Sequence, residues 1–183
     1  MRNVLICAFF GLLASAAPSQ QSKDAVKWLR GINNPVTTIF RGEMRVTGEK
    51  FAEAAEEMPA ERYKFRAAEK LESFAELVVA TIEQNYEDCA ATTGSEAPKH
   101  VELTKESSKE QLVSELKRSF SFCDSSFSHI TDKQLRDVVP LTREMLAERA
   151  GGLFMLLHGW DRRSAVLSVY LRMNQQVPPG SPE

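Results

Sequence analysis

The residues of this sequence best suited to catalysis or metal binding are its three histidines and two of its three cysteines. His100, His129 and His158 are scattered along the chain, and none belongs to a His-Glu-x-x-His pattern. The sequence also has no Cys-x-x-Cys pair, no glycine-rich phosphate loop and no Gly-x-Ser-x-Gly nucleophile motif. A functional site therefore has to be assembled from residues that are distant in the sequence.

The two cysteines outside the N-terminal segment are Cys89 and Cys123. In an oxidising compartment they could form a disulfide, which would stabilise the fold by roughly 3–4 kcal/mol in the chain-entropy model. The alternative is a pair of buried free thiols that act as small apolar groups. The sequence alone leaves both interpretations open.

The composition predicts one globular domain with an ordinary core. The chain has 183 residues, of which 43% are hydrophobic and 26% are charged, and its formal net charge is −2. These values exclude a disordered chain, a collagen-like fibre and a disulfide-dense miniprotein. The near-neutral charge provides no basic surface for nucleic acid, so we expect no nucleic-acid partner.

The N-terminus has the pattern of a secretory signal. A positive charge in residues 1–3 precedes an apolar run from Val4 to Leu13 and the small-residue triplet Ala14-Ser15-Ala16. The apolar run is about half of the roughly 20 residues that span a membrane, and the alternative is a buried N-terminal helix. We expect cleavage after residue 16, an N-terminal extension over 17–34, no transmembrane segment after cleavage, and an exported protein that is periplasmic or secreted.

Helical periodicity dominates the remaining chain, and no stretch shows a convincing strand alternation. Proline, glycine and capping patterns set the expected helix ends. The expected helices run from Pro35 to Met58, from Leu71 to about Cys89, from Ser108 to Phe127, over a short stretch from Thr131 to Pro140, and from Leu141 or Thr142 to about Asn174. Gly151-Gly152 is expected to bend or interrupt the last helix.

Several segments in a fixed order carry a resemblance to a known family. They are Ser73-Phe74-Ala75-Glu76-Leu77-Val78, Leu157-His158-Gly159-Trp160-Asp161-Arg162, Val169-Tyr170-Leu171-Arg172 and Val177-Pro178-Pro179. In this order and spacing they resemble the DinB-like (DinB/YfiT-like) family, whose members are regarded as metalloenzymes. The resemblance implies an all-α, DinB-like four-helix bundle with short extra helices over residues 35–179, followed by a tail at 180–183.

The resemblance also implies a metal site made of three histidines. One histidine comes from the second helix, and two come from the last helix at i and i+4, where they share one helix face. Members with known activity are described as thiol S-transferases. Here the three positions fall on Ala80, His158 and Arg162, and the acidic residue before the last is present as Asp161. Only one of the three imidazoles remains, and a single imidazole does not hold Zn²⁺ or Ni²⁺ tightly.

Three interpretations of this degenerate ligand set follow. In the first, the Arg162 guanidinium pairs with Glu83 or Asp161 and replaces the metal. In the second, His158 and carboxylates such as Glu83 or Glu76 form a rearranged site, whose oxygen ligands favour Mn or Mg over Zn. In the third, which does not depend on the resemblance, His158 is a buried core residue beside Trp160.

The favoured function is therefore a metal-free binding or structural variant of a metalloenzyme scaffold, with an unknown small molecule or protein as its partner. The alternative is a divalent-metal enzyme, thiol S-transferase-like or hydrolytic, that uses Zn, Ni or Mn. A third class is a protein that binds a partner through an exposed apolar helix face. The resemblance implies that such bundles pair through their helices, so we also expect a homodimer.

Overall fold

The computed structural model describes residues 27, 30–142 and 144–181. The predicted signal at 1–16 and most of the predicted extension at 17–34 lie outside these residues. The chain divides into two compact units, residues 1–33 and 34–183. In the described part of the first unit, the Gly31 amide donates to the Lys27 carbonyl at 3.2 Å. Among the described residues, none of the helices has the length and apolar character needed to cross a membrane.

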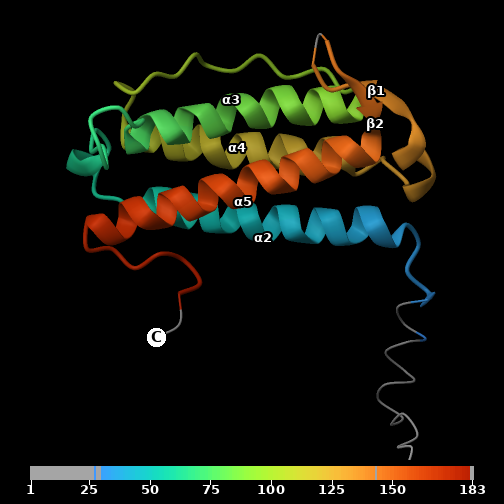
Figure 1. The fold of residues 1–183 in the computed structure, drawn as a ribbon, viewed down its shortest axis with the longest axis horizontal. Coiled ribbons are helices and arrows are strands. Elements are labelled where there is room, and N and C mark those ends of the chain that lie inside the picture. Colours follow the sequence, from blue (N-terminus) through green and yellow to red (C-terminus); the bar gives the residue numbers. More distant parts are fainter. Residues whose placement is uncertain (1–26, 28–29, 143, 182–183) are drawn as a thin grey trace, which may run out of the picture. The chain divides into compact units, whose positions relative to one another are not determined.

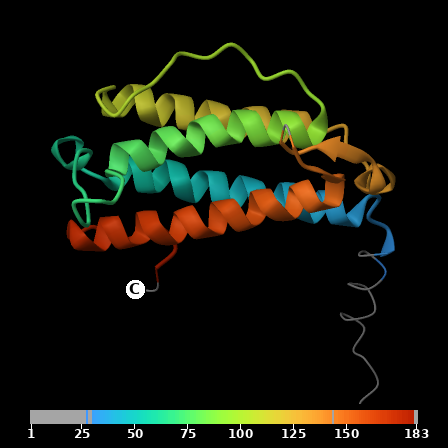
Figure 2. The ribbon, with the colours of Figure 1, turned by 45° about the horizontal axis from the view of Figure 1, so that its top comes forward.

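Four long helices form the second unit, as the sequence predicts. They are α2 (Pro35–Glu57), α3 (Phe74–Thr93), α4 (Lys109–Phe127) and α5 (Arg149–Met173). Helix α3 packs against α4, α4 against α2, α2 against α5, and α5 against α3, which closes the ring of a bundle (Figures 1 and 2). The predicted all-α four-helix bundle is confirmed.

The helix ends follow from local sequence chemistry. Ser108 caps α4 and forms the expected capping box with Gln111, and Ser73 forms an equivalent box with Glu76 at the start of α3. The cap of α2 comes from a distant residue: the Asp132 carboxylate accepts hydrogen bonds from the Val36 and Thr37 amides, both at 2.9 Å. Pro35 occupies the first turn of α2, as expected.

The segment before α5 differs from the predicted helices. A 3-10 turn, η2 (Asp132–Arg136), is followed by the strands β1 (Val138–Pro140) and β2 (Leu146–Glu148), which pair as an antiparallel hairpin. Helix α5 therefore begins at Arg149 rather than at Leu141 or Thr142. Strands of three residues are too short to show alternation in the sequence, which explains the wrong prediction.

Arg149 fixes the start of α5 through its side chain. Its buried guanidinium donates to the Thr92 and Thr93 carbonyls at 3.0 and 2.9 Å, at the C-terminal end of α3. Gly151-Gly152 lies within the continuous helix α5 and does not interrupt it. A Cβ at Gly152 would lie 2.7 Å from Cγ2 of Thr92, so this glycine permits close packing of α3 and α5.

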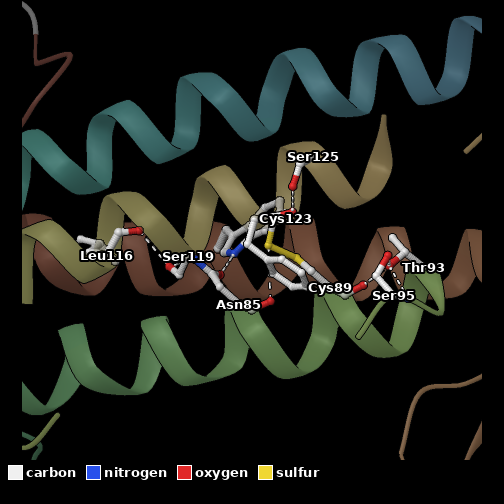
Figure 3. The surroundings of a disulfide bond; sticks show 10 residues. Asn85, Cys89, Thr93, Ser95, Leu116, Ser119, Cys123 and Ser125 are labelled. Carbon is white, nitrogen blue, oxygen red and sulfur yellow. Dashed lines mark hydrogen bonds between the residues drawn. A yellow bond between two sulfur atoms is a disulfide. The ribbon is translucent and has the colours of Figure 1, made fainter. Parts of the chain in front are cut away.

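The centre of the bundle is filled by aromatic side chains and one disulfide. Trp160 is buried, and its ring lies 5.6 Å from that of Phe120 and 6.1 Å from that of Phe40. Cys89 on α3 and Cys123 on α4 form the disulfide, with their Cα atoms 5.4 Å apart (Figure 3). This bond links two neighbouring helices inside the core.

Candidate functional site

The three positions that the resemblance assigns to a metal differ in their exposure. Ala80 is half-buried on α3, whereas His158 and Arg162 are both exposed on α5. Trp160 lies between them in the sequence and is buried. Residues two apart on a helix point to nearly opposite sides, so a buried Trp160 is consistent with an exposed His158 and Arg162. The structure therefore places His158 outside the core, which corrects its interpretation as a buried core histidine.

The two carboxylates proposed as partners of Arg162 are also exposed. Glu83 and Asp161 both face solvent, and Arg162 forms no ion pair with either of them within the described residues. Glu83 lies two residues from Asn85, whose side chain points into the core, so Glu83 turns away from it. The expected pair between Arg162 and a carboxylate is absent from this part of the chain.

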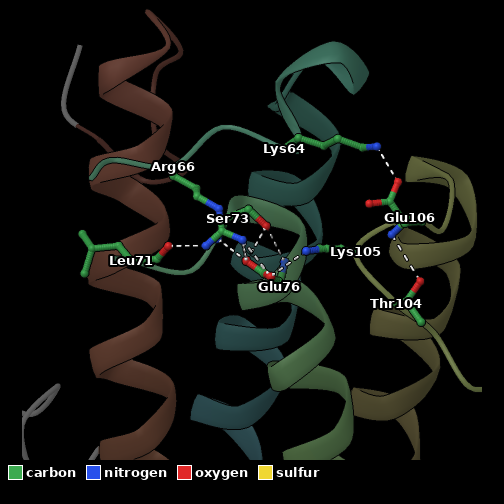
Figure 4. A network of polar contacts seen from close by, with 8 residues as sticks. All are labelled: Lys64, Arg66, Leu71, Ser73, Glu76, Thr104, Lys105 and Glu106. Atoms are coloured by element: carbon green, nitrogen blue, oxygen red, sulfur yellow. Dashed lines mark hydrogen bonds and ion pairs between the residues drawn. The ribbon is translucent and has the colours of Figure 1, made fainter. Parts of the chain in front are cut away.

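Glu76, the other carboxylate considered as a ligand, forms hydrogen bonds and ion pairs at the start of α3 (Figure 4). Its carboxylate accepts from the Ser73 amide at 2.7 Å and from Arg66 Nη2 at 2.9 Å, and Lys105 Nζ lies 3.7 Å away. The Ser73 hydrogen bonds and the Arg66 charge lower the pKa of Glu76 from 4.5 to about 2. Glu76 is therefore part of the cap of α3.

Replacing Glu76 with glutamine is expected to lower the free energy of unfolding at neutral pH by roughly 1 kcal/mol, because charged hydrogen bonds are lost. A carboxyl with a lowered pKa stabilises the fold above its ordinary pKa, and this stabilisation is lost as the pH falls. The variant should therefore lose less stability than the wild type between about pH 4.5 and pH 2. Urea unfolding across this range would measure it, with Glu83→Gln as an exposed control. Equal pH dependence of Glu76→Gln and wild type would contradict the assignment.

Arg163 is the charged residue of α5 that faces α3, and no motif in the sequence indicates it. Arg163 is half-buried, and its pKa is lowered, first by burial, although the charges of Asp88 and Glu72 oppose this shift. Asp88 lies across from it on α3, and desolvation raises the pKa of Asp88 in spite of the Arg163 charge. Gly159 precedes Arg163 by one turn, and a Cβ built there would lie 3.8 Å from Nη1 of Arg163.

A groove with a volume of about 670 Å³ lies between α2 and α4. Its floor is apolar and includes the buried side chains of Met44 and Phe120. Gly48 brings the two helices together there, since a Cβ on it would lie 3.0 Å from the Phe120 ring. Such an apolar floor with a few polar groups around it is typical of a small-molecule site.

Charged and hydroxyl groups form the rim of this groove. Arg41 donates to Asp124 Oδ1 through both Nε and Nη2, at 3.0 and 2.8 Å. Arg45 also lines the groove and has no ion pair within the described residues. Ser121 and Ser125 add exposed hydroxyls from α4.

Comparisons with known proteins relate this architecture to solved structures. No protein-family model matches the chain, and no curated protein matches it either. A DinB-like protein, YjoA, from Bacillus subtilis superposes with a TM-score of 0.64 at 15% identity, covering 79% of this chain and 95% of that one. The chain has a DinB-like fold. A DinB-like protein from Bacillus cereus ATCC 10987 matches similarly, with a TM-score of 0.63 at 14% identity, 78% coverage of this chain and 95% of that one.

In this DinB-like bundle the residues present do not fit a three-histidine metal site. Among the described residues, no group of three or more histidine, cysteine, aspartate or glutamate side chains is arranged to hold a metal ion. Every buried side-chain nitrogen or oxygen in the same part of the chain has a hydrogen-bond partner. Asn85, for example, donates to Ser119 and accepts from Trp160, at 2.9 and 2.8 Å.

Proposed function

We propose that this chain is an exported, metal-free binding protein that uses the DinB-like fold as a scaffold. The groove between α2 and α4 is its binding site. The observation that carries the proposal is this groove with its apolar floor, in a fold whose expected metal ligands are mostly missing. The three ligand positions are Ala80, His158 and Arg162, and together they offer one imidazole, on an exposed helix face. This groove lies on α2 and α4, whereas those three positions lie on α3 and α5.

The groove indicates the chemical class of the ligand. Met44 and Phe120 would contact an apolar body, and the hydroxyls of Ser121 and Ser125 would donate to acceptors on it. Arg41 is paired with Asp124 and Lys117 with Glu56, so among the described residues that line the groove Arg45 is the cation available for an anionic group. The preferred ligand is therefore an amphipathic small molecule with an apolar ring or chain and one negative charge.

The disulfide supports export. Cys89 and Cys123 are both fully buried and bonded, and such bonds persist in oxidising compartments outside the cytosol. The secretory pattern at the N-terminus remains a prediction. A divalent-metal enzyme that uses His158 with carboxylates is the alternative function, and a near-stoichiometric transition metal in the purified protein would support it.

Binding of 8-anilinonaphthalene-1-sulfonate tests the groove, because this probe combines an aromatic body with one sulfonate. We expect Ser125→Phe, which fills the groove from an exposed position, to weaken binding by about tenfold, a loss of about 1.4 kcal/mol. Glu83→Phe adds the same side chain to an exposed site on α3 and is the matched control. Fluorescence titration of both variants measures the difference, and equal affinities would refute the groove as the binding site.

A further inference from the structure

A hollow separate from the groove between α2 and α4 lies where the connection from α3 reaches the start of α4. Residues 95–107, which we call the strap, run back along the bundle from the end of α3 to the start of α4 (Figures 1 and 2). The hollow between the strap and α4 has a volume of about 320 Å³, at the lower end of the range for small-molecule sites. Its lining consists of Val101 and Leu103 of the strap and of Glu110, Gln111, Ser114 and Glu115 of α4.

Contacts on either side of the hollow hold the strap against the bundle. The ring of His100 stacks on that of Tyr86, with the centroids 4.4 Å apart. Arg118 donates from Nη2 to the Lys99 carbonyl at 3.4 Å, and the Leu103 side chain is buried. The wall that the strap contributes is therefore formed before any ligand arrives, which lowers the entropic cost of binding.

A buried carboxylate lines the side of the hollow formed by α4. The Glu115 side chain is only 9% exposed, and its Oε1 accepts from the Tyr86 hydroxyl at 2.7 Å. Within the described residues, the partner of its Oε2 is Arg118 Nη1 at 3.4 Å, which is long for a hydrogen bond between charged groups. A buried carboxylate is costly unless it is well paired, so a cation in the hollow would stabilise Glu115.

Glu110 adds a second carboxylate from the first turn of α4. It is exposed and forms no ion pair within the described residues. Hydrogen bonds from its own amide and from Ser108 lower the pKa of this carboxyl, so Glu110 is charged at neutral pH. None of the described residues that line the hollow is basic. The lining therefore combines two negative charges with the apolar side chains of Val101 and Leu103.

We propose that this hollow binds a small organic cation, a protonated amine with a compact apolar body. The ammonium pairs with Glu115 and Glu110, and the apolar body contacts Val101 and Leu103. A metal ion fits less well, because no group of three or more ligating side chains is found in the described part of the chain and apolar walls offer no ligand. The site is distinct from the groove between α2 and α4, with which it shares no lining residue.

Calorimetric titration of the full chain with 2-phenylethylamine tests this site, because the probe carries one ammonium and one aromatic ring. The uncharged 2-phenylethanol has the same apolar body and should bind at least about tenfold more weakly. We expect Glu110→Gln and Glu115→Gln each to weaken binding of the amine by about tenfold, because each removes one negative charge from the lining. Glu83→Gln removes an exposed charge from α3 and is the matched control, which should bind the amine as the wild type does.

A second pair of variants tests the place of binding without changing any charge. Ser114→Phe fills the hollow from an exposed position and should abolish binding of the amine. Ser125→Phe fills the groove between α2 and α4 instead and should leave binding of the amine unchanged. Equal affinities for the amine and the alcohol, loss of the amine in Ser125→Phe but not in Ser114→Phe, or no saturable binding by the wild type would each overturn the proposal.

Discussion

Removing the disulfide by the double substitution Cys89→Ala/Cys123→Ala is expected to lower the free energy of unfolding by about 3–4 kcal/mol. The bond joins residues separated by 34 positions, so it restricts a long loop of the unfolded chain. Both cysteines are fully buried, and alanine at both positions keeps these sites apolar. Urea unfolding followed by circular dichroism would measure the change.

A reducing agent provides an independent control for this prediction. Wild-type protein unfolded in the presence of a thiol reductant should approach the stability of the alanine variant, whereas the variant itself should not respond to the reductant. A wild-type transition that is the same with and without the reductant, under conditions that reduce the unfolded chain, would show that the bond contributes little.

The same loss of stability bears on where the protein works. Globular domains are stable by about 5–15 kcal/mol, so a loss of 3–4 kcal/mol removes a large part of the total. A reduced form would therefore be populated in partly unfolded states far more often than the bonded form. If the measurement shows such a dependence on the oxidised pair, it supports the proposed export.

The long helices could be predicted from the sequence because their signals are local. Ser108 and Gln111 mark the start of α4, and Pro35 marks the start of α2. The hairpin before α5 could not be predicted, since its strands contain three residues each. It is fixed by distant contacts instead, among them the bonds of Arg149 to the end of α3, and such contacts leave no periodic pattern.

The candidate site was harder to predict because a helix turns by about 100° per residue. An alignment can place His158 and Arg162 four residues apart on the last helix, which correctly puts them on one face. It cannot establish which face that is. In the structure the i and i+4 pair directed toward α3 is Gly159 and Arg163, one residue further along.

This shift by one residue leads to the last prediction. The double variant Gly159→His/Arg163→His places two imidazoles at i and i+4 on the side of α5 that faces α3, opposite the Asp88 carboxylate. Two histidines, one carboxylate and a water form a common tetrahedral zinc site. We expect this variant to bind one Zn²⁺ with a dissociation constant on the order of 1 μM.

The matched control is Ala80→His/Arg162→His, which completes the three histidines at the positions implied by the resemblance. Since Ala80 is half-buried on α3 while His158 and Arg162 are exposed on α5, we expect the three imidazoles not to converge and metal uptake to stay at background. Elemental mass spectrometry and calorimetric titration of both variants and the wild type would measure the difference. Tight binding by the control would mean that α5 is rotated relative to this structure. Near-stoichiometric metal in the wild type would replace the binding-protein proposal with the metalloenzyme alternative, because the native residues would then suffice to hold the ion.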